Sequence, residues 1–185
     1  ALSILVDHVQ QAMNTEVCSV YVYNSDTKRH ILRATKGLNP ASVGKVSLSN
    51  NEGLVGFVAA REEPINLDDA SKHPKYHFLS GTGEEKFNSF LGVPIINQKR
   101  ILGVLVVQQP DRRKFDESEE AFMVTMSAQL AGVLAHAEAT GQVLERPDQF
   151  KKKKVKQDVV VKGAAAAPGI AIGTVVVLSP TADLY

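Results

Sequence analysis

The sequence is poor in cysteine, in excess charge of either sign and in long apolar runs, and each absence excludes a class of protein. Its one cysteine, Cys18, cannot form an internal disulfide and is compatible with a reducing cytoplasm. With 21 basic and 20 acidic residues the formal net charge is +1, so no global field marks a nucleic-acid or membrane-surface binder. No run is long enough to span a bilayer, and no charged leader precedes an apolar signal segment. We therefore expect a cytoplasmic protein with no nucleic-acid or membrane partner.

The 185 residues, 44% of them apolar, suffice for one domain with a genuine core and some additional sequence. The chain begins at Ala1 without a methionine and stops at Tyr185 in the middle of a pattern. We expect it to be a piece of a longer protein.

Apolar residues at helical spacing predict helices, and β-branched runs bounded by glycine, proline or asparagine predict strands. The helices are expected over residues 2–14, over 52–61 with Asn51 as the N-cap, and after Asp116, which forms a capping box with Glu119. The expected strands cover residues 17–23, 31–35, 45–48, 64–67 and a hairpin over 90–107. Between them, residues 68–87 are expected to form a long loop with a short helix near 74–78.

The hairpin, FLGVPIINQKRILGVLVV, is apolar on both sides of each strand, so we expect it to lie inside a sheet that is covered on two faces. Gly92, Pro94 and Gly103 interrupt it, which indicates either a bend or bulge, or room for another group to approach the backbone.

The order of elements predicts an α+β fold with a central antiparallel sheet. The N-terminal and C-terminal helices are expected to pack on one face, and a helix and the long loop to form a pocket on the other, where such a fold holds a small molecule. The last helix has a broad apolar arc that is wider than one sheet contact needs, so part of it is expected to meet the first helix or a second subunit. Its main stripe comprises Phe122, Met126, Leu130, Val133 and Ala137.

Four blocks of the sequence, in this order and spacing, resemble the GAF domain family: SVYVYNSDTKRHILRATKG, NEGLVGFVAAREEPINLDDASKHPKY, SFLGVPIINQKRILGVLVVQQ and FDESEEAFM. GAF domains are small-molecule sensor modules that usually dimerise through their terminal helices. The resemblance implies a sensor domain over residues 1–142, a homodimer, and a central hairpin that forms the floor of the ligand pocket.

The tail extends the resemblance to a second domain. The charged stretch RPDQFKKKKVKQD marks a linker over residues 143–158, and the glycine-rich sequence over 159–185 resembles the start of the phosphoenolpyruvate-utilising domain of Enzyme I. Together with a preceding GAF domain, this points to the nitrogen-related Enzyme I family of phosphoenolpyruvate-protein phosphotransferases. Its members use magnesium to transfer phosphate from phosphoenolpyruvate to their own histidine and then to a small phosphocarrier protein.

The resemblance also implies an effector and a regulatory role. Glutamine and 2-oxoglutarate are the suggested effectors of the family, and the phosphorylated histidine lies beyond this chain. No residue here is therefore expected to be catalytic, and no cofactor is expected in this fragment. The alternative is a module that only dimerises and spaces the parent enzyme, with its pocket filled by Phe78, Phe87 and Phe90.

Position in the predicted fold selects the candidate ligand-binding residues. They are Phe57, Asn66, Asp68, Asp69, Tyr76, Phe78, Ser89 and Leu91. An amino acid or keto acid requires a cation for its carboxylate and an acceptor for any ammonium group. Asp68 or Asp69 is the expected acceptor; the expected cation is Lys72, Lys75 or Lys86. The alternative for each is a loop charge that faces water.

Two other motifs give weaker indications of a functional site. His73 and His77 have the spacing of metal ligands on a helix, but Pro74 allows only the start of a helix there, and we expect no metal site. The glycines of Gly81-Thr82-Gly83 indicate a flexible pocket lid, because the phosphate-loop pattern is absent.

Overall fold

The computed structural model describes residues 2–77 and 80–141. The helices are α1 (Leu2–Met13), α2 (Gly53–Arg61) and α3 (Glu117–Thr140), with short 3-10 helices η1 (Pro40–Ser42), η2 (Ala70–Lys72) and η3 (Glu84–Lys86). The strands are β1 (Val17–Asn24), β2 (Arg29–Lys36), β3 (Ser47–Leu48), β4 (Ile65–Leu67), β5 (Ser89–Asn97) and β6 (Arg100–Gln109). Residues up to His136 belong to one compact unit. In the described ranges, no helix is long and apolar enough to cross a bilayer.

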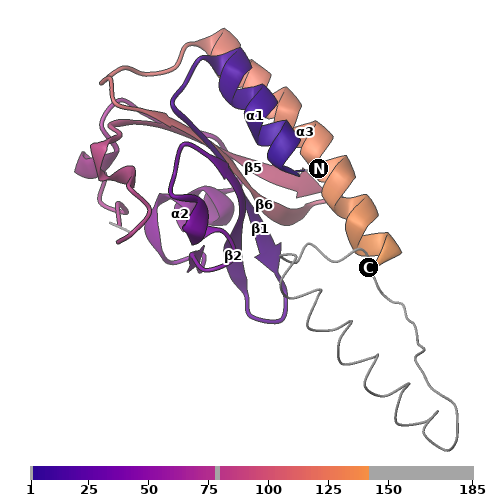
Figure 1. The fold of residues 1–185 in the computed structure, drawn as a ribbon. Coiled ribbons are helices and arrows are strands. Elements are labelled where there is room, and N and C mark those ends of the chain that lie inside the picture. The colour runs from indigo at the N-terminus through magenta and orange to yellow at the C-terminus, as the bar shows by residue number, and fades with distance from the viewer. Residues whose placement is uncertain (1, 78–79, 142–185) are drawn as a thin grey trace, which may run out of the picture. The chain divides into compact units, whose positions relative to one another are not determined.

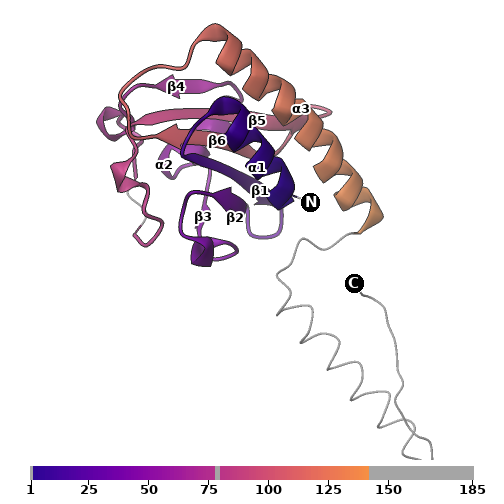
Figure 2. The same ribbon diagram turned by 45° about the horizontal axis from the view of Figure 1, so that its top comes forward.

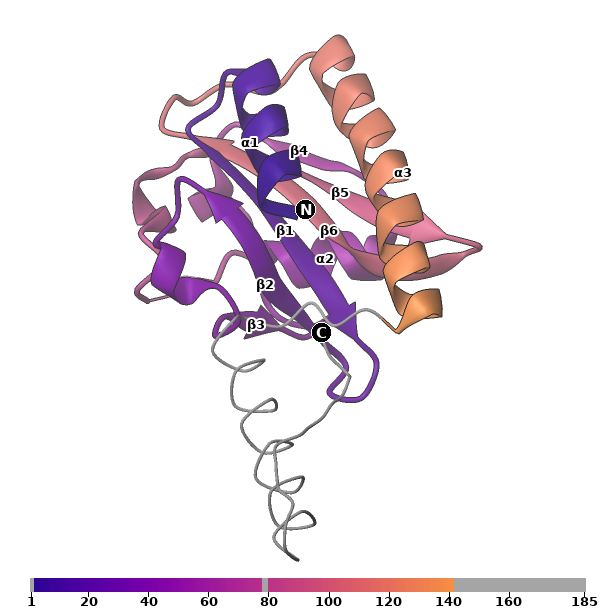
Figure 3. The ribbon, with the colours of Figure 1, turned by 45° about the vertical axis from the view of Figure 1, so that its right-hand side comes forward.

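The strands form one antiparallel sheet in the order β3-β2-β1-β6-β5-β4. Helices α1 and α3 cover one face and α2 the other (Figure 1, Figure 3). Figure 2 shows the short strands β3 and β4 at opposite edges. The predicted α+β arrangement of two terminal helices against one helix and a loop is confirmed.

Side chains that alternate along the central strands supply two separate cores. On the α2 face, Val104 and Val106 of β6 pack with Phe90 of β5 and Val58 of α2. The intervening residue Leu105 is also fully buried, on the side of α1 and α3. The β5–β6 hairpin is therefore covered on both faces, as its continuous apolar runs predict.

The predicted N-cap of α3 is confirmed, whereas the predicted N-cap of α2 is wrong. At α3, the Glu119 amide donates to Asp116 Oδ1 at 2.8 Å and the Asp116 amide donates to Glu119 Oε1 at 2.9 Å. At α2, the N-cap is Glu52 rather than Asn51, and its side chain does not cap the helix. Glu52 Oε1 accepts from the Ser49 amide instead, so the carboxylate fixes the turn before the helix.

The long loop folds differently from the prediction of a helix near 74–78. Its helical turns are η2, which begins at Ala70, and η3, which begins at Glu84. After Pro74 the backbone makes a turn in which the Lys75 amide donates to His73 Nδ1 at 3.0 Å. This local bond replaces a helical one, so the two histidines are not aligned on a helix face.

The two glycines of the hairpin allow close approach to the backbone, and the sheet also contains a local irregularity. A Cβ atom at Gly103 would overlap the carbonyl oxygen of Tyr21 in β1, and one at Gly92 would lie 2.9 Å from Val58 Cγ2 of α2. The register of β5 against β6 shifts between Ile95 and Ile96. The hairpin therefore contains both features that the sequence indicated: close backbone approach at Gly92 and Gly103, and a bulge or irregularity between Ile95 and Ile96.

We predict that Gly103→Ala lowers the free energy of unfolding by about 1 to 3 kcal/mol, because the new methyl group meets rigid backbone in a central strand. Gly132→Ala is the matched control, since nothing lies within 4 Å of a Cβ atom at that exposed helical position. It should stabilise the protein by about 0.5 to 1 kcal/mol. Urea denaturation measures both changes, and equal effects would contradict the packing described here.

Candidate functional site

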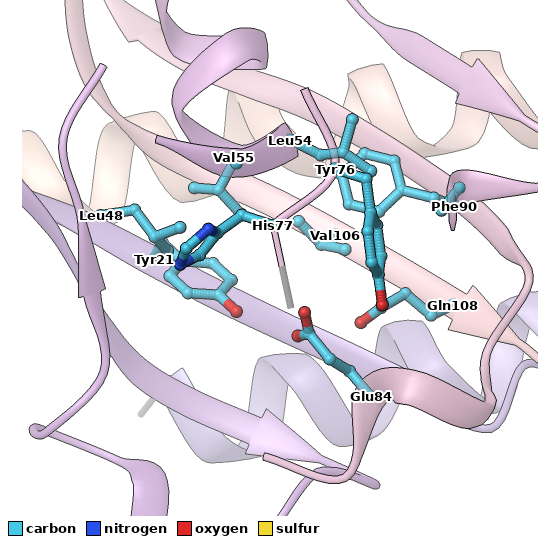
Figure 4. A pocket seen from close by; sticks show the side chains of 12 residues that line it. Tyr21, Leu48, Leu54, Val55, Tyr76, His77, Glu84, Phe90, Val106 and Gln108 are labelled. Carbon is cyan, nitrogen blue, oxygen red and sulfur yellow. The ribbon is translucent and has the colours of Figure 1, made fainter. Parts of the chain in front are cut away.

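A small cavity that opens to solvent lies on the α2 face of the sheet, and its free volume is about 30 Å³. The elements around it are β1, β6 and β5 of the sheet, the first turn of α2, and the loop that carries η2 and η3 (Figure 4). Its apolar wall comprises Leu48, Leu54, Val55, Ala70, Phe90 and Val106. This volume has room for ordered water, and a larger molecule requires the lining side chains to move.

The polar side chains of the cavity gather across from α2. Glu84 projects from η3 between the hydroxyl ends of Tyr21 and Tyr76, with Gln108 and His77 on the same lining (Figure 4). Burial, the neighbouring charge of Glu85 and a hydrogen bond with Thr82 act on the carboxylate. The first two outweigh the third and raise the pKa of Glu84 to about 7.

The charge of Glu84 also affects the pKa values of the two tyrosines, Tyr21 and Tyr76. Burial raises the pKa of Tyr21, and the charge of Glu84 raises it further. The pKa of Tyr76 is raised by burial first and then by Glu84 and Glu85. Both phenols therefore remain neutral and can act as hydrogen-bond donors.

Gln108 places a carboxamide in the cavity from β6. The residue is only 7% exposed, and within residues 2–77 and 80–141 its side chain has no hydrogen-bond partner. The amide faces the cavity, where water or another molecule can bind it.

Helix α2 presents its first turn to the same space through Gly53, Leu54 and Val55. These residues are buried, and no acceptor for their amide groups is found in the described part of the chain. A side chain at Gly53 would meet Leu48 Cδ2 at 2.9 Å and His77 Cβ at 3.5 Å. The glycine therefore keeps this end of the cavity clear.

Of the residues expected to bind a ligand, Tyr76 lines this cavity. Phe57 lies on α2 but packs its ring against His73, with ring centroids 5.0 Å apart. Leu91 follows the cavity residue Phe90 in β5, so it points to the opposite face of the sheet. Phe78 lies outside the described residues.

The remaining candidates hold loops together. Asn66 joins β4 to the start of α3, because its amide nitrogen donates to the Phe115 carbonyl at 2.8 Å and its oxygen accepts from the Phe115 amide at 3.1 Å. Ser89 Oγ contacts the Asp111 carbonyl and accepts from the Arg113 amide at 3.1 Å. These side chains bind backbone groups rather than the cavity.

The charged candidates also lie away from the cavity. Asp68 is exposed, and Asp69 accepts from Ser71 Oγ at 2.7 Å. The carboxylate of Asp69 lies 3.7 Å from Lys72 Nζ and 3.5 Å from Arg112 Nε. Lys75 is exposed, and Lys86 lies over the Phe87 ring. The predicted acceptor and cations are thus absent from the lining of the cavity, as far as the described residues go.

Comparison with known proteins identifies the family. Residues 1–134 match the family model of the GAF domain. The chain belongs to the GAF domain family.

This GAF domain is 48% identical to the GAF domain from Acinetobacter phosphoenolpyruvate-protein phosphotransferase, with a TM-score of 0.70 over 77% of this chain and 84% of that one. It is 45% identical to the GAF domain from a phosphoenolpyruvate-protein phosphotransferase of Coxiella burnetii, with a TM-score of 0.74 over 77% of this chain and 85% of that one.

The resemblance to a longer protein, inferred from the sequence, is also confirmed. The chain is 44% identical, over 174 residues, to a protein of Salmonella typhimurium named phosphoenolpyruvate-dependent phosphotransferase system. The match covers 94% of this chain and 22% of that protein. The chain therefore spans about a fifth of the length of this curated relative.

Sequence reasoning about this GAF domain missed Glu84, Gln108, Tyr21 and the first turn of α2. Glu84 follows Gly83 in a loop of mixed composition, where a carboxylate usually faces water. The one available signal was Gln108, a polar residue at the end of the apolar run of β6, on the face that Val104 and Val106 share.

We predict that the desolvated carboxylate makes this GAF domain less stable as pH rises. The pKa of Glu84 lies above its ordinary value of 4.5, so the folded protein binds the proton more tightly than the unfolded chain. The free energy of unfolding should fall as pH rises from 4.5 through about 7. Glu84→Gln should abolish this component, which we expect to be about 1 to 3 kcal/mol.

Urea unfolding of the wild type and of Glu84→Gln is measured at about pH 5 and about pH 8. The change in the free energy of unfolding between the two pH values, wild type minus Glu84→Gln, gives that component. Glu16→Gln is the control, because Glu16 is exposed and does not line the cavity. A pH dependence that survives in Glu84→Gln would show that another group is responsible.

Proposed function

We propose that this GAF domain is the regulatory, small-molecule-sensing module of a phosphoenolpyruvate-protein phosphotransferase. The longer parent protein would transfer phosphate from phosphoenolpyruvate to its own downstream histidine and then to a phosphocarrier protein, in the cytoplasm and in nitrogen-related signalling. Similarity to the Salmonella typhimurium protein and to the Acinetobacter and Coxiella burnetii GAF domains supports this parentage. Magnesium would serve the downstream transferase domain.

The sensing role rests on one observation: the carboxyl group of Glu84 and the carboxamide of Gln108 face one cavity whose lining is mainly apolar. Burial raises the pKa of Glu84, and no side-chain hydrogen-bond partner of Gln108 is found in the described part of the chain. Such groups reduce stability unless water or a ligand binds them. A pocket that only completed a core would be filled by apolar side chains instead.

Glutamine and 2-oxoglutarate are the effectors that we propose for this site. Regulation requires that the effector bind the active and inactive forms of the parent enzyme with different affinity, since equal affinity shifts nothing. The first turn of α2 and the η3 loop both line the cavity, so a ligand there can change how they pack.

A second role, dimerisation through the terminal helices, is favoured by the outer surface of the helical layer. Its exposed large apolar residues are Ile4 of α1, at 73% exposure, with Val124 and Val133 of α3 at 45% and 41%. Val133 belongs to the apolar stripe predicted for this helix. We propose a homodimer that buries these side chains and coexists with ligand sensing.

Calorimetric titration with L-glutamine and 2-oxoglutarate tests the sensing role. We predict a dissociation constant in the millimolar range or tighter for one of them. Gln108→Leu should weaken binding about tenfold or more without lowering the melting temperature, because an unpartnered buried amide is replaced by an apolar group of similar size.

Gln109→Leu is the matched control, since Gln109 is equally buried on the same strand but its side chain alternates to the other face. It should bind as the wild type does. No heat with either compound, together with no thermal stabilisation, would contradict the sensing role.

A further inference from the structure

His30 of β2 is a titratable side chain that does not line the cavity and has no part in the proposed sensing site. The residue is completely buried, and its ring packs against Tyr23 of β1 with ring centroids 4.9 Å apart. Nε2 lies 2.7 Å from Asn50 Oδ1 in the turn before α2. Nδ1 is buried and has no hydrogen-bond partner in the described part of the chain. Buried polar atoms of native proteins nearly always have a partner, so this nitrogen requires an explanation.

The two ring nitrogens differ in what they can accommodate. An amide oxygen can only accept, so Nε2 carries the hydrogen of the neutral ring and donates it to Asn50 Oδ1. A second proton would go to Nδ1, where it would place a charge and an unpaired donor in the protein interior. Burial accordingly lowers the pKa of His30, and the hydrogen bond with Asn50 offsets only part of this effect. The covered ring is therefore stable only in its neutral form.

The surroundings of the ring provide no carboxylate that could pair with an imidazolium ion, as far as the described residues go. The titratable groups on the segments around it are Tyr23 from β1, Glu52 from the turn before α2 and His77 from the long loop, while β3 contributes none. Glu52 is already bound, because Arg29 Nη2 donates to its Oε1 at 2.7 Å. His77 can only add positive charge.

The turn that contains Asn50 is packed closely onto α2. The Glu52 amide donates to the Ser49 carbonyl at 3.1 Å, and a Cβ atom at Gly56 of α2 would overlap the same carbonyl oxygen. Because rigid backbone meets rigid backbone here, the turn and the helix must move together. Leu48, directly before the turn, and the first turn of α2 both line the cavity. Movement of the turn would therefore change the α2 face of the domain.

We propose that His30 is a pH-sensitive switch: its neutral, buried ring holds the turn 49–52 against β2, and protonation at mildly acidic pH releases the turn together with α2. The other contact of the turn with β2, the ion pair of Arg29 with Glu52, has side chains that are 38% and 43% exposed. An ion pair with that exposure contributes little, so it cannot hold the turn alone. This switch goes beyond ligand sensing, because it requires a proton and no other ligand.

The direction of the pH effect follows from the two protonation equilibria. The unfolded or opened chain binds the proton with a pKa near the ordinary 6.5, and the closed form binds it more weakly. The closed form therefore keeps its full stability above pH 6.5 and loses it as pH falls below that value. Glu84 contributes in the opposite direction, since its pKa is raised. Glu52 remains ionised in this range, because its bond with the Ser49 amide lowers its pKa below 4.5.

Amide hydrogen exchange of the 185-residue chain, measured by NMR at about pH 7.5, 6.5 and 5.5 and corrected for intrinsic rates, tests the switch. The reporters are the amides of Ser49, Glu52 and Gly56, which form the hydrogen bonds of the turn and the start of α2. Their protection should fall about 5- to 10-fold between pH 6.5 and 5.5, because one proton changes the opening constant by at most about tenfold per pH unit. The amides of β5 and β6 should keep theirs.

Three variants identify the group that titrates. Asn50→Asp, at an exposed position, gives the imidazolium ion a carboxylate and should reduce the response to less than about twofold. Asn51→Asp is the matched control for added charge, since Asn51 is the exposed neighbour, and His77→Gln is the control for the other histidine. Both controls should respond as the wild type does. The proposal is overturned if the reporters show no response, if β5 and β6 lose protection in parallel, if Asn50→Asp responds fully, or if His77→Gln does not respond.

Discussion

The burial of the β5–β6 hairpin from both sides is the constraint on which the cavity depends. Strand β6 pairs with β1 on one side and β5 on the other, and Gly103 permits the close approach of the Tyr21 carbonyl. One set of β6 side chains enters the helical layer, and the alternate set, ending at Gln108, faces the cavity. A shift of register by one residue would exchange the two sets and place Gln109 in the cavity instead.

The difference between satisfied and unsatisfied polar groups separates structure from function in this fold. Asn66 and Ser89 are polar residues with specific partners, the Phe115 backbone for the first and the Asp111 and Arg113 backbone for the second. Their contacts stabilise loops. Glu84 has a hydrogen bond with Thr82, no side-chain partner of Gln108 is found in the described part of the chain, and both side chains face the cavity. That contrast identifies the site more directly than residue type does.

The sequence predicted the elements whose signals are local. The capping box at Asp116, the apolar runs of the central hairpin and the period of the first helix each depend on residues close together in the chain, and each is confirmed. The N-cap of α2 was predicted wrongly because the Glu52 carboxylate accepts from the Ser49 amide in the turn before the helix. Arg29 of β2, which is distant in the sequence, also donates to this carboxylate.

The candidate site was harder to predict because its members come from distant segments. Tyr76 was proposed from its place in the long loop and lines the cavity, whereas Glu84 has the sequence pattern of a surface acid and only the fold places it beside Tyr21. Asn66 and Ser89 had the right chemistry for a ligand but are occupied by backbone groups, since loops must satisfy their own amides and carbonyls.

An NMR titration of the uniformly labelled chain with L-glutamine tests the central claim most directly. The account predicts the largest shifts at the amides of Gly53, Leu54 and Val55 and at the side-chain amide of Gln108, which line one cavity. Shifts confined to the exposed faces of α1 and α3 would contradict it, because they would place the binding surface on the other side of the sheet.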